Sequence, residues 1–321
     1  MNPIEIFRTN FEFPNQTRFY RGKVRDVYVI KDKYLVLVNT DRISAFDQVF
    51  WQTIKYKGCI LNQISNFFFE YTSNLHQNWA ITSPHPCVTI GHYYARLPYE
   101  FIVRQHLDGW VWKEYHRGIR RFWNVILPNN LERFSALPKL IFSITTKSQS
   151  GKDIPVSYNK VFSEAYLNRN ELYQIREICF DLFQKASNFY SQKNLILADT
   201  KLELSKDKVI LDEIFTPDCS RLYNATNYNQ RLQKRQEVEN FSKEVFRKIL
   251  LDSGFDPVEL VNKENPLPSI SISQRQLISQ KYSHVYKSVF DKDISQNNPQ
   301  MFSSSILQDI YQSTCEALKN L

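Results

Sequence analysis

The first hundred positions of the chain alternate between apolar and polar residues. Two runs rich in β-branched and aromatic residues, at positions 19–30 and 34–39, flank the polar residues 31–33. This pattern predicts two strands joined as a hairpin. Shorter strands are predicted at residues 87–90 and 101–104. We therefore expect the chain to open with an antiparallel β lobe.

Apolar residues recur at helical spacing elsewhere in the chain. Residues 59–71 predict an amphipathic helix, and residues 163–192 predict one long helix or two. Three amphipathic helices are expected near the end, separated by breaks rich in Asn and Pro. Their expected positions are residues 241–251, 273–290 and 303–318. We expect these tail helices to cover the sheet of a second lobe.

The middle of the chain is less regular. A stretch punctuated by proline, residues 127–155, shows neither period and predicts loops around a cleft. After the long helix, residues 195–198 and 209–211 predict two short strands joined by the polar turn 206–208. A chain of 321 residues exceeds the usual size of one domain, so two lobes are expected.

The formal charge of +8, from 41 Lys and Arg against 33 Asp and Glu, suits nucleic acid, an anionic membrane or small phosphorylated ligands. The basic residues are dispersed apart from short groups such as residues 117–121. A dedicated nucleic-acid face is therefore not expected. Compositional drift, indicated by only 7 glycines, explains the charge without a functional cause.

The cysteines and the hydropathy pattern bear on location. The 5 cysteines are far apart and form no CxxC pair or zinc-binding spacing, which fits a reducing cytoplasm. No stretch approaches the ~20 apolar residues that span a bilayer. The first residues lack the cationic start and apolar core of a signal peptide. We expect a cytoplasmic protein that is neither secreted nor embedded in a membrane.

Three stretches carry candidate chemistry, and the first is Arg-Gly-Lys-Val-Arg-Asp at residues 21–26. In a continuous strand, Lys23 and Arg25 would point to the same face and could meet one polyphosphate. Gly22 would let that phosphate approach the backbone. The alternative is a solvated basic face of the hairpin.

The second stretch, residues 41–47, packs two carboxylates, an arginine and a serine into a short segment after a strand. It fits an active-site turn. A structural turn capped by Asp41 and Ser44 fits as well, and it is the reading that the residues alone favour.

The third stretch alternates charges along a predicted strand. Asp199, Lys201 and Glu203 would fall on one face, where two carboxylates need a cation between them. The neighbouring arm adds Asp212 and a charged turn that contains a proline. Carboxylates on adjacent strands commonly hold Mg²⁺ on nucleotide phosphates. A ladder of surface salt bridges is the alternative.

Taken in order, these stretches resemble the phosphoribosylaminoimidazole-succinocarboxamide (SAICAR) synthase family. The resemblance covers residues 20 to about 255 and leaves the last helices unmatched. One motif could arise by chance, whereas the ordered set is specific. The matching residues are 22–28, 41–47, 57–58, 63–65, 103–104, 109, 112–115, 145–147, 153, 198–201, 203, 212–213, 216–218 and 220–221.

The resemblance implies an α+β fold. A kinase-like N-terminal antiparallel β lobe, residues 1–100, would cover ATP, and an ATP-grasp-like α+β lobe with the C-terminal helices would form residues 101–321. The implied enzyme is an ATP-dependent ligase of de novo purine biosynthesis. It would join L-aspartate to carboxyaminoimidazole ribotide through an acyl phosphate, giving SAICAR, ADP and phosphate. These small molecules are the expected partners, with neither nucleic acid nor membrane.

The resemblance also implies a nucleotide and metal site. Gly22, Lys23 and Arg25 would lie along the phosphates of ATP, and Lys23 would also be catalytic. Glu203 and Asp212 would bind Mg²⁺. This placement agrees with the chemistry, because cations must spread the charge on a phosphoryl group during its transfer.

The remaining implied roles concern the reaction and the ribotide. Asp47, Asp199 and Lys201 would be catalytic. Arg104 and Arg221 would hold the ribotide phosphate, and the imidazole would lie near residues 199, 201, 218 and 220. The implied set of substrate-binding residues is Arg104, Asp218, Ser220, Arg221, Lys243 and Arg247.

Several positions depart from the family pattern on the substrate side. Trp110 stands where a small hydroxyl or an imidazole would touch the substrate. Lys152 replaces the histidine of a Gly-His-Asp motif, Ser242 replaces the aspartate that begins a later helical motif, and Ser205 replaces a glycine. These changes affect substrate affinity more than nucleotide chemistry, because the implied metal pair and phosphate cations are retained.

Two other functions fit part of the pattern. A phosphotransferase on a related kinase-like fold would carry His-Arg-Asp and Asp-Phe-Gly motifs, and this chain has neither. A catalytically weakened homologue could instead act as a phosphate-binding or RNA-binding protein. Such a binder would gain nothing from keeping Glu203 and Asp212 together, and a nucleic-acid shift assay over a salt series would separate the two cases.

Overall fold

The computed structural model divides the chain into two compact units. It describes residues 5–123, 125–147, 154–256 and 267–321. The first unit comprises residues 1–69, 79–93 and 241–321. The second unit comprises residues 70–78 and 94–240. The predicted division at residue 100 differs from this one, because the C-terminal segment belongs to the first unit.

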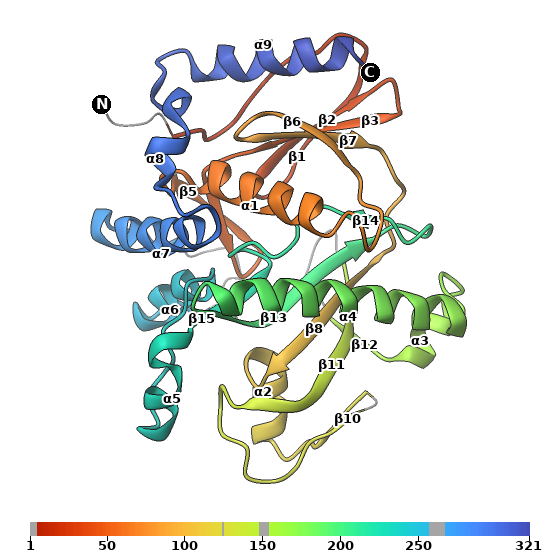
Figure 1. The fold of residues 1–321 in the computed structure, drawn as a ribbon, viewed down its shortest axis with the longest axis vertical. Coiled ribbons are helices and arrows are strands. Elements are labelled where there is room, and N and C mark those ends of the chain that lie inside the picture. The colour runs from red at the N-terminus through yellow and green to blue at the C-terminus, as the bar shows by residue number, and fades with distance from the viewer. Residues whose placement is uncertain (1–4, 124, 148–153, 257–266) are drawn as a thin grey trace. The chain divides into compact units, whose positions relative to one another are not determined.

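A five-stranded antiparallel sheet, in the order β1-β2-β3-β7-β6, forms the centre of the first unit (Figure 1). Its strands are β1 (Gln16–Arg21), β2 (Arg25–Ile30), β3 (Tyr34–Asn39), β6 (Ala80–His85) and β7 (Val88–His92). The predicted hairpin around residues 31–33 is confirmed. The single strand predicted over residues 19–30 is wrong, because a turn at residues 22–24 divides it into β1 and β2.

The rest of the first unit is a small hairpin and several helices. The hairpin pairs β4 (Arg42–Ala45) with β5 (Gln48–Thr53), and α1 (Lys57–Tyr71) follows it. The helices of the tail are α6 (Glu244–Asp252), α7 (Ile272–Phe290), α8 (Ile294–Asn297), the 3-10 helix η2 (Pro299–Phe302) and α9 (Ile306–Lys319).

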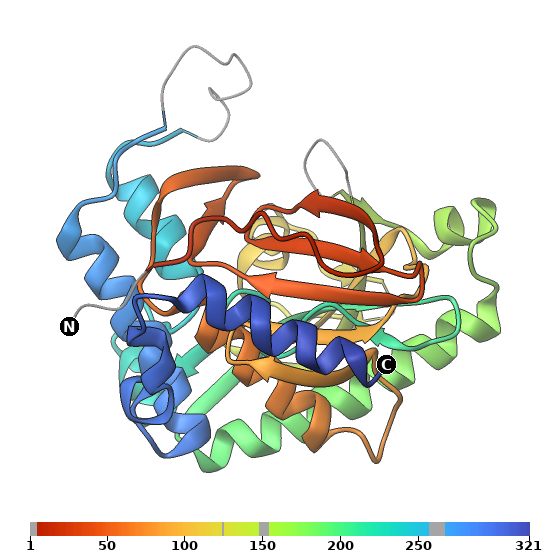
Figure 2. The same cartoon turned by 90° about the horizontal axis from the view of Figure 1, so that it is seen from above.

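The expected role of the tail helices is wrong. They belong to the first unit, where α9 packs against β6 and α6 packs against α7. Figure 2 shows α9, in dark blue, alongside the strands of this unit. Helical periodicity specified which face of each helix is apolar but not which sheet that face would meet.

The second unit is built on a six-stranded sheet (Figure 1). Its strands run in the order β12 (Pro155–Val156), β11 (Ala136–Thr146), β8 (Tyr99–His106), β13 (Leu195–Leu204) and β14 (Ile210–Leu211), and β15 (Ser220–Asn224) also pairs with β13. All of these pairs are antiparallel. The long helix α4 (Arg169–Gln192) packs on β13 and β8. The observed α+β class is the predicted one.

The loops predicted over residues 127–155 are wrong, because that stretch contains β11, an 11-residue strand. The pairing of β11 with β8 shifts register between Ala136 and Ile141. Pro138 lies in the shifted part, and a proline lacks the N–H that a regular ladder requires. The irregular sequence therefore marks a bulged strand that its neighbours on both sides hold in place.

Smaller elements complete the second unit: α2 (Gly109–His116), β9 (Arg121–Phe122), β10 (Val125–Ile126), α3 (Tyr158–Ser163) and α5 (Ala225–Gln233). The helix predicted from residue 163 begins at Arg169, where Asn168 and Glu171 form a capping box. Across the described parts of both units, no helix combines the length and apolar content needed to cross a bilayer.

Candidate functional site

The β1–β2 turn, residues 22–24, carries the first candidate cation. The Gly22 N–H donates to the Arg25 carbonyl at 2.8 Å, which closes the turn. The Lys23 side chain is 51% exposed, and its ammonium pairs with the Asp47 carboxylate. Lys23 lies in a turn and Arg25 begins a strand, so the prediction that they share one strand face is wrong.

Asp41 begins the second candidate stretch, residues 41–47. Asp41 is buried, and its carboxylate accepts the Ile6 N–H at 2.7 Å and the Gly58 N–H at 2.9 Å. It therefore anchors the start of α1 and the segment at Ile6. Ser44 lies in strand β4, so the predicted turn capped by Asp41 and Ser44 is wrong. Burial raises the pKa of Asp41 to about 7, and the two N–H donors oppose this rise.

Asp47, at the far end of the same stretch, faces Lys23. Phe46 and Asp47 both have positive φ, 51° and 64°, a conformation that non-glycine residues rarely adopt. They form the two-residue loop between β4 and β5, since Ala45 pairs with Gln48, and positive φ at both loop residues is typical of a type I′ hairpin turn. This hairpin loop holds the partly exposed Asp47 carboxylate beside the Lys23 ammonium of the β1–β2 turn.

Arg42 is a residue that the sequence reasoning missed. It is 3% exposed, and its guanidinium donates to the carbonyl oxygens of Gly22 and Lys23, each at 3.1 Å. It also donates to the buried Asp26 carboxylate at 2.9 Å. An arginine within a strand that is otherwise buried was the available signal for a structural cation.

Two of the predicted substrate residues lie in the first unit, near the start of α6. The Lys243 ammonium donates to the Ser44 hydroxyl at 3.3 Å, so Lys243 meets the 41–47 stretch. Arg247 pairs with Glu244 one turn earlier on the same helix. The structure therefore places Lys243 beside residues 41–47.

The second unit carries a charged strand face. We use this name for Glu100 and Arg104 on β8, Asp199, Lys201 and Glu203 on β13, and Arg221 on β15. Asp199 lies directly opposite Arg104 on one neighbouring strand and opposite Arg221 on the other. Directly opposed residues share a face of a sheet, so the predicted alternation brings these charges together.

Most charges on this face are paired with a neighbour. Arg221 donates to Asp199 at 2.5 Å, and Lys201 donates to Glu100 at 2.5 Å. Lys147 pairs with Glu203. The negative charges of Glu100 and Glu203 raise the pKa of Lys201 although its burial acts in the opposite direction. The sequence did not single out Glu100, because the residues next to it carry no charge.

Arg104 differs from the other cations of the charged strand face. It is 6% exposed, and within the described residues its Nε and Nη1 meet no hydrogen-bond acceptor. Burial lowers the pKa of Arg104, as does the nearby Arg221, whereas the Asp199 carboxylate raises it. Two buried N–H groups aimed at no protein atom suit an anionic ligand.

Asp108 and Gly109 hold Arg221 from the other side. The Asp108 carboxylate accepts hydrogen bonds from Arg133 at 2.8 Å and from the Tyr223 hydroxyl at 2.9 Å, and it lies 3.6 Å from Arg221 Nε. Gly109 has a φ of 60°, and a Cβ there would stand 2.6 Å from Arg221 Nη2. The glycine is therefore required by both its conformation and its neighbour.

Trp110 follows immediately as the second residue of α2. Its ring packs against Phe122 and Trp123, with ring centroids 6.1 Å and 5.8 Å apart, and the residue is 38% exposed. These contacts attach it to the small core between α2 and the β9–β10 hairpin. The resemblance predicted that Trp110 stands where the substrate binds. In the structure, its ring joins this local aromatic group.

Glu203 and Asp212 form the predicted carboxylate pair. Glu203 is buried, and burial followed by the negative charge of Asp212 raises its pKa, while Lys147 and Lys201 lower it. Glu203 pairs with Leu211 across β13 and β14, which places Asp212 at the end of that short ladder. In the part of the chain that the structure describes, no group of three side chains forms a ready metal cluster.

The other predicted residues lie close to this face or outside the description. The Ser220 and Thr200 hydroxyls are 2.8 Å apart on adjacent strands, and the Asp218 N–H donates to the Thr216 hydroxyl at 3.3 Å. Lys152 and Asp153, in the stretch that resembles a Gly-His-Asp motif, lie outside the described residues.

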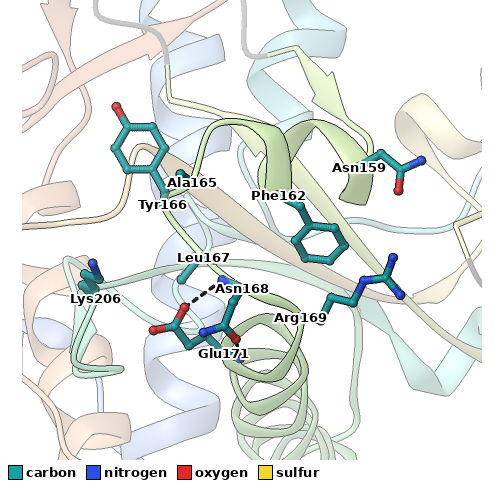
Figure 3. Close-up of a pocket in the computed structure, with 9 residues that line it drawn as sticks. All are labelled: Asn159, Phe162, Ala165, Tyr166, Leu167, Asn168, Arg169, Glu171 and Lys206. Carbon is teal, nitrogen blue, oxygen red and sulfur yellow. Dashed lines mark hydrogen bonds between the residues drawn. The ribbon is translucent and has the colours of Figure 1, made fainter.

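A separate cavity of about 770 Å³ opens beside the start of α4 (Figure 3). Its polar lining is largely satisfied internally, since Asn168 and Glu171 bond to each other's backbone. None of the predicted site residues lines it. The lining residues are Asn159, Phe162, Ala165, Tyr166, Leu167, Asn168, Arg169, Glu171 and Lys206.

Comparison with known proteins agrees with the resemblance seen in the sequence. The family model described as SAICAR synthetase matches residues 18–259. The phosphoribosylaminoimidazole-succinocarboxamide synthase of Flavobacterium psychrophilum is 35% identical over 98% of this chain and 99% of its own length. The enzyme of the same name from Cytophaga hutchinsonii is 35% identical over 97% of this chain and 99% of its own length.

Solved structures show the same fold. The SAICAR synthase from Saccharomyces cerevisiae complexed with SAICAR aligns with a TM-score of 0.73 and 24% identity, covering 90% of this chain and 99% of its own. A SAICAR synthetase in complex with ADP aligns with a TM-score of 0.64 and 20% identity, covering 86% of this chain and 99% of its own. On the extent of the family match and of the curated relatives, this chain belongs to the SAICAR synthetase family.

Proposed function

We propose that the chain makes SAICAR with the residues of the β1–β2 turn and of the charged strand face. Family membership assigns the overall activity, phosphoribosylaminoimidazole-succinocarboxamide synthase, a ligase of purine biosynthesis. The observation that carries the proposed roles is the charged strand face, where Asp199 stands between two arginines and the buried Nε and Nη1 of Arg104 meet no acceptor among the described residues.

The reaction requires activation of a carboxylate, which is a poor electrophile. An oxygen of the imidazole carboxylate attacks the γ-phosphorus of ATP, and the bond to the bridging oxygen breaks to release ADP. The aspartate amine then attacks the acyl phosphate carbon and loses a proton. Phosphate leaves as the amide forms. Each step places extra charge on phosphoryl oxygens, which cations must stabilise.

In the first unit, we assign the nucleotide phosphates to Gly22, Lys23 and Arg25. Lys23 is exposed and already neutralises Asp47, so a phosphate would exchange one anionic partner for another. Asp47 would then be released to act near the reacting groups. A family neighbour in complex with ADP supports use of a nucleotide.

In the second unit, Glu203 and Asp212 fit a divalent cation. Their mutual repulsion and the burial of Glu203 raise the pKa of that carboxyl, and a cation would remove this penalty. Two carboxylates leave positions for water and phosphate oxygens, the arrangement that Mg²⁺ prefers. When bound, Mg²⁺ would supply charge to the phosphoryl oxygens.

We assign the ribotide to the arginines of the charged strand face. Arg104, with two buried N–H groups lacking acceptors, and Arg221, held by Asp199, would bind its phosphate. Lys201 is held by Glu100, and together with Asp199 it would act beside the imidazole carboxylate. Asp218 and Ser220 would contact the imidazole.

The free thiols of all 5 cysteines support placing the protein in the reducing cytoplasm.

The test is ADP release by the purified protein with ATP, Mg²⁺, carboxyaminoimidazole ribotide and L-aspartate, each omitted in turn. Release that requires all four, with SAICAR formed in equal amount, is the expected result. Binding of ATP without turnover would contradict the proposal and favour a weakened homologue that retains only phosphate binding.

A further inference from the structure

The β1–β2 turn presents its carbonyl groups to the interior of the first unit. Arg42 donates to the Gly22 and Lys23 carbonyl oxygens, each at 3.1 Å. Thr40 donates to the Val24 carbonyl from its N–H at 3.1 Å and from its hydroxyl at 2.8 Å. Three successive carbonyl groups are therefore bound from behind by residues of one short segment.

This arrangement fixes the direction of the intervening amides. In a trans peptide the C=O and the N–H of one plane point in opposite directions, and no described peptide bond is cis. The N–H groups of Lys23 and Val24 therefore point away from Arg42. Neither amide donates to any residue that the structure describes. Successive N–H groups directed to one side form a concave site for an anion.

Arg42 is itself held rigidly. Its guanidinium donates to Asp26 at 2.9 Å, and the Asp26 carboxylate also accepts the Thr9 N–H at 2.6 Å. A further hydrogen bond, at 2.5 Å, joins Arg42 to the Phe7 carbonyl. The buried guanidinium thus has each of its three nitrogens bound, and it cannot turn to meet a ligand without breaking its pair with the buried Asp26.

We propose that Arg42, assisted by Thr40, is a positioning residue of the nucleotide site. By binding the turn carbonyls, it directs the Lys23 and Val24 amides outward to hold a phosphate group together with the Lys23 ammonium. Arg42 does not touch the nucleotide. The inference rests on the nucleotide role proposed for this turn. It gives residues 41–47 a part in that role, because Arg42 bonds the carbonyls of the β1–β2 turn.

Arg21 offers a matched control. Its Nε donates to the same Asp26 oxygen that Arg42 contacts, at 3.1 Å, and its other bonds go to Thr9 and Asn10. Arg21 therefore shares the charge partner of Arg42 but bonds to neither turn carbonyl. Lysine at either position keeps the charge beside Asp26, whereas only lysine at position 42 loses the paired contacts to the carbonyls.

The experiment compares Arg42→Lys with Arg21→Lys by titrating ATP, ADP and adenosine into each protein. We expect Arg42→Lys to weaken ATP and ADP binding about tenfold, because the Lys23 and Val24 amides lose their orientation toward the phosphate, and to leave adenosine binding unchanged. Arg21→Lys should bind all three as the wild type does. In turnover, the KM for ATP should rise while the KM values for ribotide and aspartate stay constant.

Thr40→Val supplies a second variant that keeps the side-chain shape and the Thr40 N–H bond, and we expect about a threefold loss of ATP affinity. It decides the matter if Arg42→Lys does not fold. Unchanged ATP binding in the folded variants, or an equal loss of adenosine binding, would overturn the inference. Failure of the proposed ligase function would appear differently, as absent turnover in a wild type that still prefers ATP to adenosine.

Discussion

The β1–β2 turn of the first unit and the charged strand face of the second place their functional groups by opposite means. At the turn, the Lys23 side chain is half exposed, and buried residues hold the backbone beneath it. On the strand face, buried carboxylates are held by ion pairs to cations that are only partly exposed. Function is therefore separable from stability at the turn and joined to it on the strand face.

The energetic reason is the difference in solvent exposure. An exposed ion pair contributes about 0–1 kcal/mol, since water screens both charges. Removal of one member of a buried pair costs about 3–5 kcal/mol, because a charge stays buried without its partner. The side chains of Asp199 and Asp108 are only 8% and 4% exposed, and both face Arg221.

The largest effect is expected for Asp212→Asn. This change removes a metal-binding charge without altering volume, and asparagine tolerates the positive φ of 63° at this position. Turnover should fall about 1,000-fold with the melting temperature almost unchanged. The assay is ADP release over a range of Mg²⁺ concentrations. Undiminished turnover at saturating Mg²⁺ would remove Asp212 from the metal site.

The next largest effect is expected for Arg221→Ala, which should change both activity and stability. The KM for ribotide should rise about 100-fold, because the phosphate loses charged hydrogen bonds. The free energy of unfolding should fall by about 3 kcal/mol, since Asp199 and Asp108 lose a buried partner. Arg221→Lys is the control and should recover much of the stability. An unchanged ribotide KM would refute the phosphate role, and unchanged stability would break the contrast between the two regions.

Lys23→Ala should affect activity alone. The pair with Asp47 is exposed, so the free energy of unfolding should change by less than about 1 kcal/mol. The KM for ATP should rise about tenfold through loss of one charged phosphate contact. Lys33→Ala, in the neighbouring turn, is a control of equal charge. A stability loss as large as that of Arg221→Ala would show that the turn depends on this side chain.

The last prediction concerns a pH-dependent stability effect that the two units share. Each contains a buried histidine, His85 in the first and His106 in the second, and burial lowers the pKa of each to about 4. Below the unfolded pKa of about 6.5, the unfolded chain binds protons that the folded chain excludes. Their contribution to stability is complete above pH 6.5 and is lost as the pH falls from 6.5 toward 4.

Urea unfolding of wild type and His106→Phe between pH 7 and pH 5 measures this contribution. The wild-type free energy of unfolding should decline by up to about 1.4 kcal/mol per pH unit for each histidine. The variant should show a shallower decline. Equal slopes would indicate that His106 becomes protonated without unfolding the second unit.

Local pattern predicted several elements correctly. The hairpin of β2 and β3 and the helix α1 follow periods that lie within a few residues of each other in the sequence. The strand β11 was missed because Pro138 interrupts its alternating pattern. The segment is nevertheless a strand, because it pairs with β8 and β12. The turn inside residues 19–30 was missed because its conformation depends on Arg42, about 20 residues away.

The candidate site shows the same division. Strand alternation placed Asp199, Lys201 and Glu203 on one face, because that relation is local to β13. Glu100 and Asp108 were missed, since neither belongs to a charged motif and each meets its partner from a distant strand. A buried carboxylate is recognisable as a partner only when the opposing cation is known.

The sequence by itself determined the family, the α+β class and the residue types that carry the chemistry, because these depend on ordered motifs and short-range periodicity. Only the tertiary structure decided that the C-terminal helices belong to the first unit, that Arg42 supports the β1–β2 turn, and that Arg104 keeps N–H groups without acceptors. Each of these depends on which distant groups are buried together, and burial sets the strength of every charge and hydrogen bond involved.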